Sequence, residues 1–359
     1  MKIAIDARFY GTAHTGLGRY TTNVLKYLPK YLTEHTLQIL LRDDQVEEFK
    51  AEKNVEKVRA EIPHYSLAEQ IQLPLLLNKL NPGLLYTFHF NAPILSKVPT
   101  IVTVHDLIKS HFKGADTTTR SPGIYALKRA GYNWVIEHTL SHAQDVIVPT
   151  NTVKNDILAA FPTMKPERIR PIAEAPDEIF RKMPTVPVSL DLPKQYLLFV
   201  GNAYPHKNLK VLLQAFKTIN DPELALVIVA KRTPFLDRTL APYDPSRIQV
   251  YSELTDPELV TVYKQAKVLI TPSLMEGYGL VGLEALMVGT PVIASNIAVY
   301  REVYADRVTY VNPHAASELS EAILAVLKEP RPHPLTFKRT WDDVAKSIAE
   351  VIHARCTHL

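Results

Sequence analysis

Two stretches of the chain open in the same way, and this repetition constrains the fold more than any other feature of the sequence. A short apolar run, Lys2–Ala7, leads into a glycine-containing loop and then into Tyr20–Leu32, whose apolar residues have helical spacing. The same order recurs at Tyr196–Val200, the loop GNAYPHKN and Leu209–Phe216. A strand, a glycine loop and a helix are the usual start of a nucleotide-binding α/β fold. We therefore predict two such domains within the 359 residues.

Strand-like runs and helical segments alternate along the whole chain. Further strands are predicted at Leu37–Leu41, Leu84–Phe88, Thr100–Val104, Asp145–Val148, Leu224–Ala230, Ile248–Glu253 and Lys267–Thr271. Further helices are predicted at Ser66–Leu80, Tyr125–Ser141, Asp256–Ala266, Leu319–Leu327 and Trp341–His353. This alternation predicts an α/β protein with parallel, doubly wound sheets. The proline-rich stretch Pro162–Lys194 has few periodic apolar residues and is interpreted as the linker between the domains.

The main chemical signal lies in the second half of the chain, at Thr271–Asn296. Glu276 and Glu284 are separated by seven residues, and Gly277 and Gly279 follow the first of them. Apolar spacing predicts that a helix begins near Gly279. Gly289 is a natural residue to follow the end of this helix, and Pro291 blocks its continuation.

This pattern suits a nucleotide diphosphate sugar. The two glycines leave backbone N–H groups bare at a helix N-terminus, which favours an anion such as a diphosphate. The two carboxylates lie on the order of 10 Å apart at the helical rise per residue. One could accept hydrogen bonds from a hexose and the other from a ribose. The alternative is two solvated surface glutamates, which the flanking Gly-Tyr-Gly and Gly-Thr-Pro-Val sequences disfavour.

Polar residues in the first half follow the ends of the predicted strands, where ligands of such sheets bind. They are His89, Asn91, His105, Asp106, Thr150 and Asn151. The alternative for His105 is a buried histidine whose hydrogen bonds are made to local backbone, and we favour the functional interpretation over it. The glycines of the first loop do not form a dinucleotide fingerprint, because Thr21 stands where the third glycine belongs. A nicotinamide enzyme is therefore disfavoured.

Composition excludes several classes of protein. A hydrophobic content of 46% and a charged content of 22% are typical of a globular domain, and no apolar run approaches a membrane span. The single cysteine, Cys356, cannot form an internal disulfide, and the chain opens without signal-peptide organisation, so we expect a cytoplasmic protein. The net charge of +4 is too small to indicate nucleic-acid binding, but it would assist contact with anionic lipid or a phosphorylated acceptor.

The stretch PSLMEGYGLVGLEALMVGTPVIAS resembles the Glu-x7-Glu signature of the family-four retaining glycosyltransferases of GT-B fold. The loop Gly16-Leu17-Gly18-Arg19-Tyr20 resembles the Gly-x-Gly-Arg-Tyr loop of the same family, and the resemblance extends over nearly the whole chain. It implies two Rossmann-like domains that face a cleft. The first would be an acceptor-binding domain at 1–175, to which a final helix at 340–359 returns, and the second a donor-binding domain at 190–335.

The resemblance also implies roles for individual residues. Glu276 and His105 would be the catalytic residues that orient the donor sugar, and Glu284 would hold the ribose. The diphosphate would lie against the amides of Gly16 and Gly279 and against Lys207, a cation at a helix start that the helix dipole alone disfavours. The other donor-binding candidates are Gly18, Asn202, Lys231, Gly277, Tyr278 and Leu280. Asn202 replaces an arginine of the family, and Lys231 or Arg232 could supply the missing charge.

The implied reaction is retaining transfer of a hexose to a saccharide or lipid-linked acceptor, in which the leaving phosphate accepts the acceptor proton. His89, Asn91, Asp106 and Arg120 are the acceptor-side candidates. The loop GNAYPHKN is similar to that of mannosyltransferases, so we expect GDP-mannose, with UDP-glucose and dTDP-rhamnose as alternatives. Any membrane contact would be peripheral, on the inner face of the membrane.

No cofactor is expected, and no obligatory metal, because the chain has no Asp-x-Asp motif. The thirteen histidines also show no helical pairing with a carboxylate base of the kind seen in metal-dependent hydrolases. Two alternative functions stay open. One is another GT-B activity, such as a nucleotide-sugar epimerase, and the other is a protein that binds the nucleotide sugar without transferring it.

Overall fold

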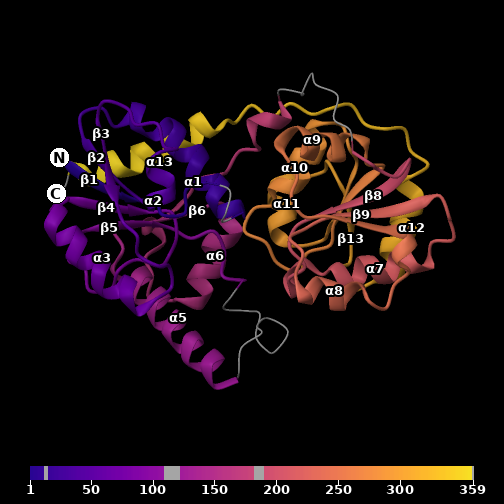
Figure 1. Ribbon diagram of the computed structural model, residues 1–359, viewed down its shortest axis with the longest axis horizontal. Helices are drawn as coiled ribbons and strands as arrows, with labels where there is room; N and C mark the ends of the chain where they lie inside the picture. The colour runs from indigo at the N-terminus through magenta and orange to yellow at the C-terminus, as the bar shows by residue number, and fades with distance from the viewer. Residues whose placement is uncertain (12–14, 109–121, 182–189, 358–359) are drawn as a thin grey trace. The chain divides into compact units, whose positions relative to one another are not determined.

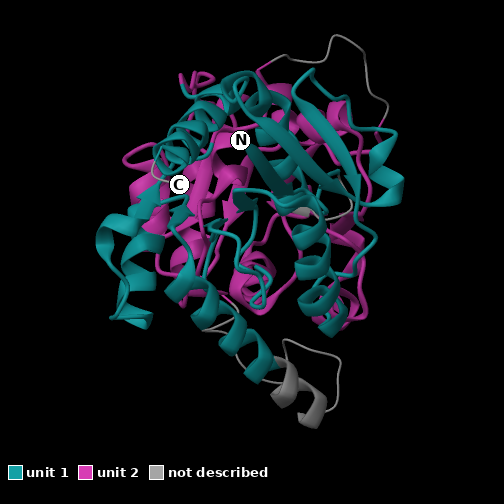
Figure 2. Cartoon of the chain, turned by 90° about the vertical axis from the view of Figure 1, so that its left-hand side faces the viewer, with its two compact units in different colours: residues 1–107, 120–174, 339–359 teal, residues 108–119, 175–338 magenta. Residues whose placement is uncertain are grey.

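A computed structural model describes residues 1–11, 15–108, 122–181 and 190–357, with the backbone alone at 15 and 122–128. The chain forms two compact units, shown by their arrangement of strands and helices in Figure 1 and by colour in Figure 2. Unit 1 comprises Met1–Leu107, Arg120–Glu174 and Arg339–Leu359, and unit 2 comprises Ile108–Thr119 and Ala175–Lys338.

In the described part of unit 1, seven parallel strands form one sheet in the order β3-β2-β1-β4-β5-β6-β7. Their bounds are β1 Lys2–Asp6, β2 Thr36–Leu41, β3 Val55–Arg59, β4 Leu84–Thr87, β5 Thr100–Thr103, β6 Asp145–Val148 and β7 Ile169–Pro171. The direction in which strands are added reverses at β1, which pairs with both β2 and β4. The central strands are buried on both faces, as uninterrupted apolar runs require.

Helices cover this sheet, and the last of them comes from the C-terminal end of the chain. They are α1 Thr15–Tyr27, α2 Asp43–Val46, α3 Leu67–Leu80, α5 Pro122–His142, α6 Asn151–Ala160 and α13 Trp341–Cys356, with short 3-10 helices η2 Leu28–Tyr31 and η4 Pro166–Arg168. The yellow helix α13 lies beside α1 in Figure 1. It is capped by Thr340, which exchanges hydrogen bonds with Asp343, and Asp342 accepts a 2.9 Å bond from the Tyr31 hydroxyl.

In the described part of unit 2, six parallel strands form a sheet in the order β10-β9-β8-β11-β12-β13. Their bounds are β8 Gln195–Val200, β9 Leu224–Val229, β10 Ile248–Tyr251, β11 Val268–Thr271, β12 Val292–Ser295 and β13 Thr309–Val311. The helices are α7 Leu209–Thr218, α8 Pro234–Leu240, α9 Asp256–Gln265, α10 Leu280–Met287, α11 Ala298–Tyr304 and α12 Ala316–Val326, with 3-10 helices η5 Glu178–Phe180, η6 Pro205–Lys207 and η7 Pro245–Arg247.

The core of unit 2 has two parts, one on each face of its sheet. Along β8, Leu197 and Phe199 join one buried cluster, whereas Tyr196 and Leu198 join the other. This division follows from the two-residue period of a strand. Burial on both faces explains why the strands read as continuous apolar runs rather than alternating ones. The predicted α/β class with two doubly wound parallel sheets is confirmed.

Two local predictions were wrong. The first helix begins at Thr15 rather than Tyr20, and the α-helix ends at Tyr27 because Pro29 converts the next turn to the 3-10 form. The stretch Pro162–Lys194 is not only a linker. Its residues Ile169–Pro171 form β7, which pairs with β6 at the edge of the sheet, a position that tolerates proline.

Several elements lack a clear sequence signal. Strand β3 is a polar run, VEKVR, and β13 has three residues, so neither shows the apolar period on which prediction depends. The seven-residue helices α8 and α11 are similarly short. Among the described helices we find none with the length and apolar composition that crossing a membrane requires.

Candidate active site

The strongest candidate site lies in unit 2, where the sheet order reverses. Strands β8 and β11 lie side by side, and β9 and β12 continue the sheet in opposite directions. Ligands of open α/β sheets bind outside the carboxyl ends of the strands at such a reversal. The segments that leave those two ends are 201–208 and 272–279, which contain half of the predicted donor-binding residues and the catalytic candidate Glu276.

Hydrogen bonds connect these two loops with each other and with the segment after β13. The Leu274 amide donates to the carbonyl oxygen of His206 at 2.7 Å. The Asn208 side chain donates to the carbonyl oxygens of Pro272 at 3.0 Å and Pro313 at 2.7 Å. Asn208 has a left-handed backbone with φ of 54°, a conformation that asparagine tolerates better than most residues. The loops are therefore one connected structure.

Glu276 lies at the centre of this structure and is 8% exposed. Its Oε1 accepts hydrogen bonds from Lys207 Nζ at 2.7 Å, Ser273 Oγ at 2.7 Å and the Tyr300 hydroxyl at 3.1 Å. Burial by itself would raise the pKa of Glu276, but the Lys207 charge and the hydrogen bonds of Lys207 and Ser273 outweigh it and lower that pKa. Within the described part of the chain, all three bonds fall on Oε1. Oε2 is thus left to accept from a ligand.

Lys207 has a counter-charge that its position in the sequence does not reveal. We expected a phosphate beside it, because a cation at a helix start is disfavoured. The structure places its ammonium in an ion pair with Glu276, with side-chain exposures of 22% and 10%. A diphosphate that binds here would share Lys207 with Glu276.

Gly279 allows the entry into α10. Its φ of 103° is in the left-handed region, and a Cβ atom here would lie 2.6 Å from the Tyr304 hydroxyl oxygen and 2.7 Å from Tyr300 Cε1. The Tyr304 hydroxyl donates to the Gly279 carbonyl at 2.6 Å. Leu280 is the first residue of α10, so the turn presents the first amides of that helix.

Glu284 lies within α10 and is 8% exposed. Its Oε2 accepts a 2.9 Å hydrogen bond from the Tyr263 hydroxyl of α9. The helix ends at Met287, and Gly289 follows with a φ of 74°. Glu284 is therefore not a solvated surface residue, which was the alternative interpretation.

The other donor-side candidates surround these groups. Asn202 is half-buried, and its carbonyl accepts from the Tyr204 amide at 2.8 Å. Gly277 is buried, and Tyr278 packs against the core cluster next to α10. Lys231 is exposed directly after β9. Arg232, the second candidate for the missing charge, instead forms an exposed ion pair with Asp237.

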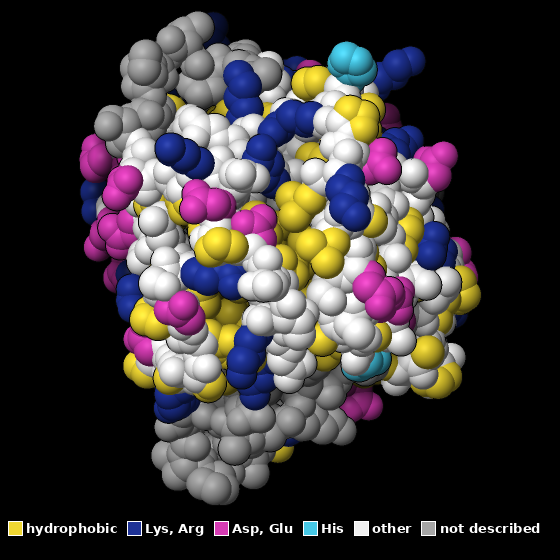
Figure 3. All heavy atoms as spheres, turned by 90° about the vertical axis from the view of Figure 1, so that its right-hand side faces the viewer, with side chains coloured by type: hydrophobic (Ala, Val, Ile, Leu, Met, Phe, Trp, Pro, Cys, Tyr) yellow, Lys and Arg dark blue, Asp and Glu magenta, His cyan; other side chains and the backbone are white. Residues whose placement is uncertain are grey.

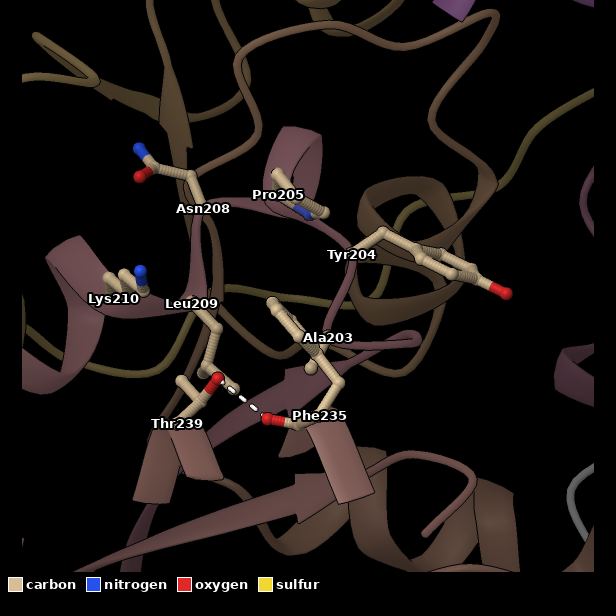
Figure 4. A pocket seen from close by; sticks show the side chains of 8 residues that line it. All are labelled: Ala203, Tyr204, Pro205, Asn208, Leu209, Lys210, Phe235 and Thr239. Carbon is tan, nitrogen blue, oxygen red and sulfur yellow. Dashed lines mark hydrogen bonds between the residues drawn. The ribbon is translucent and has the colours of Figure 1, made fainter. Parts of the chain in front are cut away.

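A small hollow lies beside the 201–208 loop. It has a volume of about 90 Å³ and is lined by Ala203, Tyr204, Pro205, Asn208, Leu209, Lys210, Phe235 and Thr239. Figure 4 shows the Thr239 hydroxyl donating to the Phe235 carbonyl within α8, while the Tyr204 ring points away from the other side chains. Pockets for nucleotide-sized ligands are several times larger. This hollow is not the donor site.

Charged side chains of both signs are interspersed on the face of the molecule drawn in Figure 3. Nucleic-acid-binding faces instead carry a basic patch or stripe.

In unit 1, His105 follows β5 and is held on three sides. Its Nδ1 lies 3.3 Å from Glu174 Oε1, and its Nε2 lies 3.1 Å from the Phe88 carbonyl oxygen. The Tyr20 ring meets the imidazole edge-on, with 4.6 Å between the ring centroids. The His105 side chain is 21% exposed and that of Glu174 is 8% exposed.

The partners of His105 favour its charged form. A carbonyl accepts only, and so does an ionised carboxylate, so two N–H groups are needed to satisfy both. Burial would lower the pKa of His105, but the hydrogen bond and charge of Glu174 outweigh burial and raise that pKa. His105 is therefore a partly buried imidazole whose acidic partner raises its pKa, a more specific arrangement than a histidine held by backbone alone.

Two glycines at the start of α1 differ in their surroundings. Gly18 is buried, and a Cβ atom at this position would lie 2.0 Å from the Gly11 carbonyl oxygen, so the close approach of two backbone segments requires glycine. Gly16 is exposed in the first turn of α1, with open space where a Cβ atom would lie. Its amide lies at a helix N-terminus, where an anion is favoured.

The acceptor-side candidates fall into one described group and one position outside it. The Tyr65 hydroxyl lies 3.2 Å from His89 Nε2, and the Asn91 amide donates to His89 Nδ1 at 3.3 Å. The Asn91 side chain donates to Glu69. Asp106 is half-buried beside His105. Arg120 lies outside the described residues.

Sequence reasoning missed several partners of these groups. Tyr300 and Tyr263 are two of many tyrosines in helical segments, and nothing in their spacing indicates contact with Glu276 or Glu284. Ser273 precedes Glu276 by three residues, the one local signal that was available. Glu174 follows β7 in the stretch interpreted as a linker, where it is one of several carboxylates among prolines and no pattern distinguishes it.

Two family models match this chain and together cover most of it. Residues 14–175 match glycosyltransferase family 4, and residues 187–352 match glycosyl transferases group 1. The O-antigen chain mannosyltransferase RfbU of Salmonella typhimurium is 26% identical over 266 residues, which are 72% of this chain and 69% of RfbU.

A second relative and a solved structure complete these findings. The serotype-specific mannosyltransferase WbdA of Escherichia coli is 26% identical over 219 residues, which are 58% of this chain and 25% of WbdA, so the chain spans about a quarter of that protein. The crystal structure of WaaG, a glycosyltransferase involved in lipopolysaccharide biosynthesis, is similar to this chain with a TM-score of 0.67 and 17% sequence identity. The match covers 97% of this chain and 95% of WaaG. This likeness shows that the fold is GT-B.

Proposed function

Because this chain belongs to the group 1 and family 4 glycosyltransferases, we propose that it transfers a hexose from a nucleotide diphosphate sugar to an acceptor hydroxyl with retention of configuration. The single observation that supports the proposal most is the setting of Glu276. Three donors hold its Oε1, its pKa is lowered, and Oε2 is left for a ligand at the carboxyl edge of the sheet. We assign Oε2 to the hydroxyl groups of the donor hexose.

The diphosphate is assigned to the turn before α10 and to Lys207. The first amides of α10 provide N–H donors and the positive end of the helix dipole. Lys207 already lies 2.7 Å from Glu276, so it can contact a phosphate without leaving the carboxylate. The ribose is assigned to Glu284, whose Oε2 is oriented by Tyr263. Lys231 supplies the second cation in this proposal.

The proposed reaction takes place on one face of the sugar. The bond from C1 to the phosphate oxygen breaks, the bond from C1 to the acceptor oxygen forms on the same side, and the released phosphate oxygen takes the acceptor proton. The protein then stabilises charge and positions groups, from which most of the acceleration comes. His105 is assigned to the hexose, where its Nε2–H exchanges the Phe88 carbonyl for a sugar hydroxyl.

GDP-mannose is the donor that we propose, and a saccharide or lipid-linked saccharide is the acceptor. The loop GNAYPHKN resembles that of mannosyltransferases, and both relatives described above are named as such. UDP-glucose and dTDP-rhamnose are the competing donors. We propose that the reaction needs no divalent ion and that any contact with a membrane is peripheral.

A thermal-shift panel in EDTA tests the donor assignment. GDP-, UDP-, dTDP- and ADP-sugars are compared, and a ligand at a hundredfold its dissociation constant stabilises by about 2.7 kcal/mol. We expect GDP-mannose to raise the unfolding midpoint most. A shift by another nucleotide class alone would replace the proposed donor, and no shift with any of them would contradict the donor site.

Turnover tests the catalytic assignment. Glu276→Ala should abolish most transfer while the affinity for the nucleoside diphosphate falls much less, because the carboxylate is assigned to the sugar. The matched control is Glu321→Ala, an exposed glutamate of α12 in the same unit. Unchanged turnover of Glu276→Ala would reject the site. Binding of the donor by the wild-type protein without turnover on any saccharide acceptor would favour a binding protein.

A further inference from the structure

Three metal-ligating side chains meet in unit 1, although one of them is far from the other two in the sequence. Glu34 and His35 lie in the turn between η2 and β2, and His353 lies in α13. One ligand atom from each of the three lies within 4.8 Å of the other two. Glu34 Oε1 lies 3.0 Å from His353 Nδ1 and 3.7 Å from His35 Nε2.

These separations are close to those of a bound zinc ion. A tetrahedral site with nitrogen and oxygen ligands at about 2.0–2.1 Å places its ligand atoms roughly 3.4 Å apart. The Glu34 side chain is 56% exposed and can rotate toward a shared ion, and the two histidine nitrogens lie within 4.8 Å of each other.

His353 is already oriented as a ligand. Its Nε2 lies 2.9 Å from the Tyr31 carbonyl oxygen, which can only accept a hydrogen bond. That contact takes up Nε2, so Nδ1 is the ring nitrogen that faces Glu34. Histidine ligands of metals commonly donate their second N–H to a carbonyl or carboxylate in this way.

His35 supplies an independent indication of a ligand. Its side chain is only 10% exposed, and its Nε2 is buried without a hydrogen-bond partner among the described residues. Its other nitrogen, Nδ1, lies 3.4 Å from the amino group of Met1. A buried nitrogen that makes no hydrogen bond is costly, and a metal ion that replaces its proton would satisfy it. The atom is directed toward Glu34 Oε1.

Helix α13 also carries a cysteine near Glu34, although its Sγ lies outside the 4.8 Å within which the three ligand atoms meet. Cys356 follows His353 by three residues, and residues three apart lie on the same face of a helix. Its thiol is free and partly buried. Two imidazoles, a carboxylate and a thiolate form a donor set that suits Zn²⁺, whereas Mg²⁺ prefers oxygen ligands.

We propose that Glu34, His35 and His353 bind a Zn²⁺ ion, with Cys356 as the fourth ligand. The ion would connect α13 to the turn before β2 and so fasten the C-terminal helix to the rest of unit 1. All of its ligands lie in unit 1, so this site is separate from the donor residues of unit 2 and does not depend on the proposed transfer.

Metal titration tests the proposal directly. The full chain is stripped with a chelator, dialysed and titrated with Zn²⁺ against a chromogenic chelator. We expect one Zn²⁺ per chain and a rise of several degrees in the unfolding midpoint, with no rise for Mg²⁺. Co²⁺ should give the visible absorption of a tetrahedral site and a thiolate-to-cobalt charge-transfer band.

Variants locate the site. His353→Ala and Glu34→Gln should each weaken Zn²⁺ binding at least tenfold, and Cys356→Ser should remove the charge-transfer band. Glu34→Gln is the safer variant for folding, because its side chain is exposed. The matched control is His142→Ala. His142 stacks on His138 of α5 with 4.0 Å between the ring centroids, so this pair could bind metal adventitiously.

The proposal is overturned if the wild-type protein shows no saturable Zn²⁺ binding. It is also overturned if binding survives in His353→Ala and Glu34→Gln but is lost in His142→Ala. A cobalt protein without the charge-transfer band would reject Cys356 as the fourth ligand. Circular dichroism of each metal-free variant establishes that it is folded.

Discussion

The ammonium of Lys207 lies 2.7 Å from Oε1 of Glu276, and this ion pair connects the loop after β8 to the loop after β11. The two residues belong to loops at adjacent strand ends, so the pairing depends on β8 and β11 being neighbours in the sheet. It keeps Glu276 ionised in a buried setting and places a cation beside the turn that precedes α10. One contact thus orients two groups that we assign to the donor.

Replacement of Lys207 by methionine should weaken binding of the nucleoside diphosphate by roughly tenfold to a hundredfold. The reason is the loss of one charge-assisted hydrogen bond, typically about 1.5–3 kcal/mol. Calorimetric titration measures the effect. Lys210→Met, three residues further on and exposed, is the control and should bind as the wild type does. Equal affinities for the two variants would remove Lys207 from the diphosphate site.

Glu276 should make the free energy of unfolding depend on pH in the acidic range. Its pKa is lowered below the ordinary value of 4.5, so its contribution is fully present above that value and is lost as the pH falls through the lowered pKa. We expect the free energy of unfolding of Glu276→Gln to differ most from wild type at neutral pH and to converge with it in acid. Urea denaturation at several pH values tests this, and a difference that does not shrink in acid would contradict the lowered pKa.

Substitution by alanine should destabilise the protein at Gly279 but not at Gly16. At Gly279 the positive φ and the contacts with Tyr304 and Tyr300 should cost at least about 1–3 kcal/mol of stability. At Gly16 a Cβ atom meets open space in the first turn of a helix, so Gly16→Ala should be neutral or slightly stabilising. Chemical denaturation of the two variants side by side measures the difference. A loss of stability in Gly279→Ala that is no larger than in Gly16→Ala would mean that α10 can form without its left-handed turn.

His105 should titrate above its ordinary pKa of 6.5, and Glu174→Gln should bring that pKa down. The bond and charge of Glu174 favour the imidazolium, whereas the burial that remains in the variant opposes it. The stabilisation by this pair is present below pH 6.5 and is lost as the pH rises through the raised pKa. Histidine resonances followed by NMR across the pH range report both values. A pKa that is unchanged in Glu174→Gln would assign the shift to another group.

Arg8 should be essential to the stability of unit 1. Its guanidinium is fully buried, bonds to Asp6 at 2.6 Å and Glu69 at 2.7 Å, and donates to the Ile62 carbonyl at 2.9 Å. Arg8→Ala leaves two buried carboxylates uncompensated, which should cost about 3–5 kcal/mol. Arg59→Ala removes only exposed ion pairs and should cost less than about 1 kcal/mol. Thermal unfolding compares the two, and a small effect at Arg8 would show that the carboxylates become protonated or hydrated.

Local structure could be predicted where the physical cause is local. Strand β6 has the predicted bounds, Asp145–Val148, because a strand buried on both faces is an uninterrupted apolar run. The limits of α10 also follow from local chemistry, since Gly279 and Gly289 supply the left-handed turns at its two ends. Strand β7 could not be predicted, because three residues with a proline carry no period.

The sequence by itself determined the class of fold, the two strand–loop–helix openings and the glycine-flanked carboxylates, because backbone preference and apolar period depend on neighbouring residues. Only the tertiary structure decided which charges pair. Lys207 with Glu276, His105 with Glu174 and Glu34 with His353 are each brought together by strand order or by the return of α13 to unit 1. Such pairs arise from contacts between segments distant in the chain, for which a single sequence contains no periodic signal.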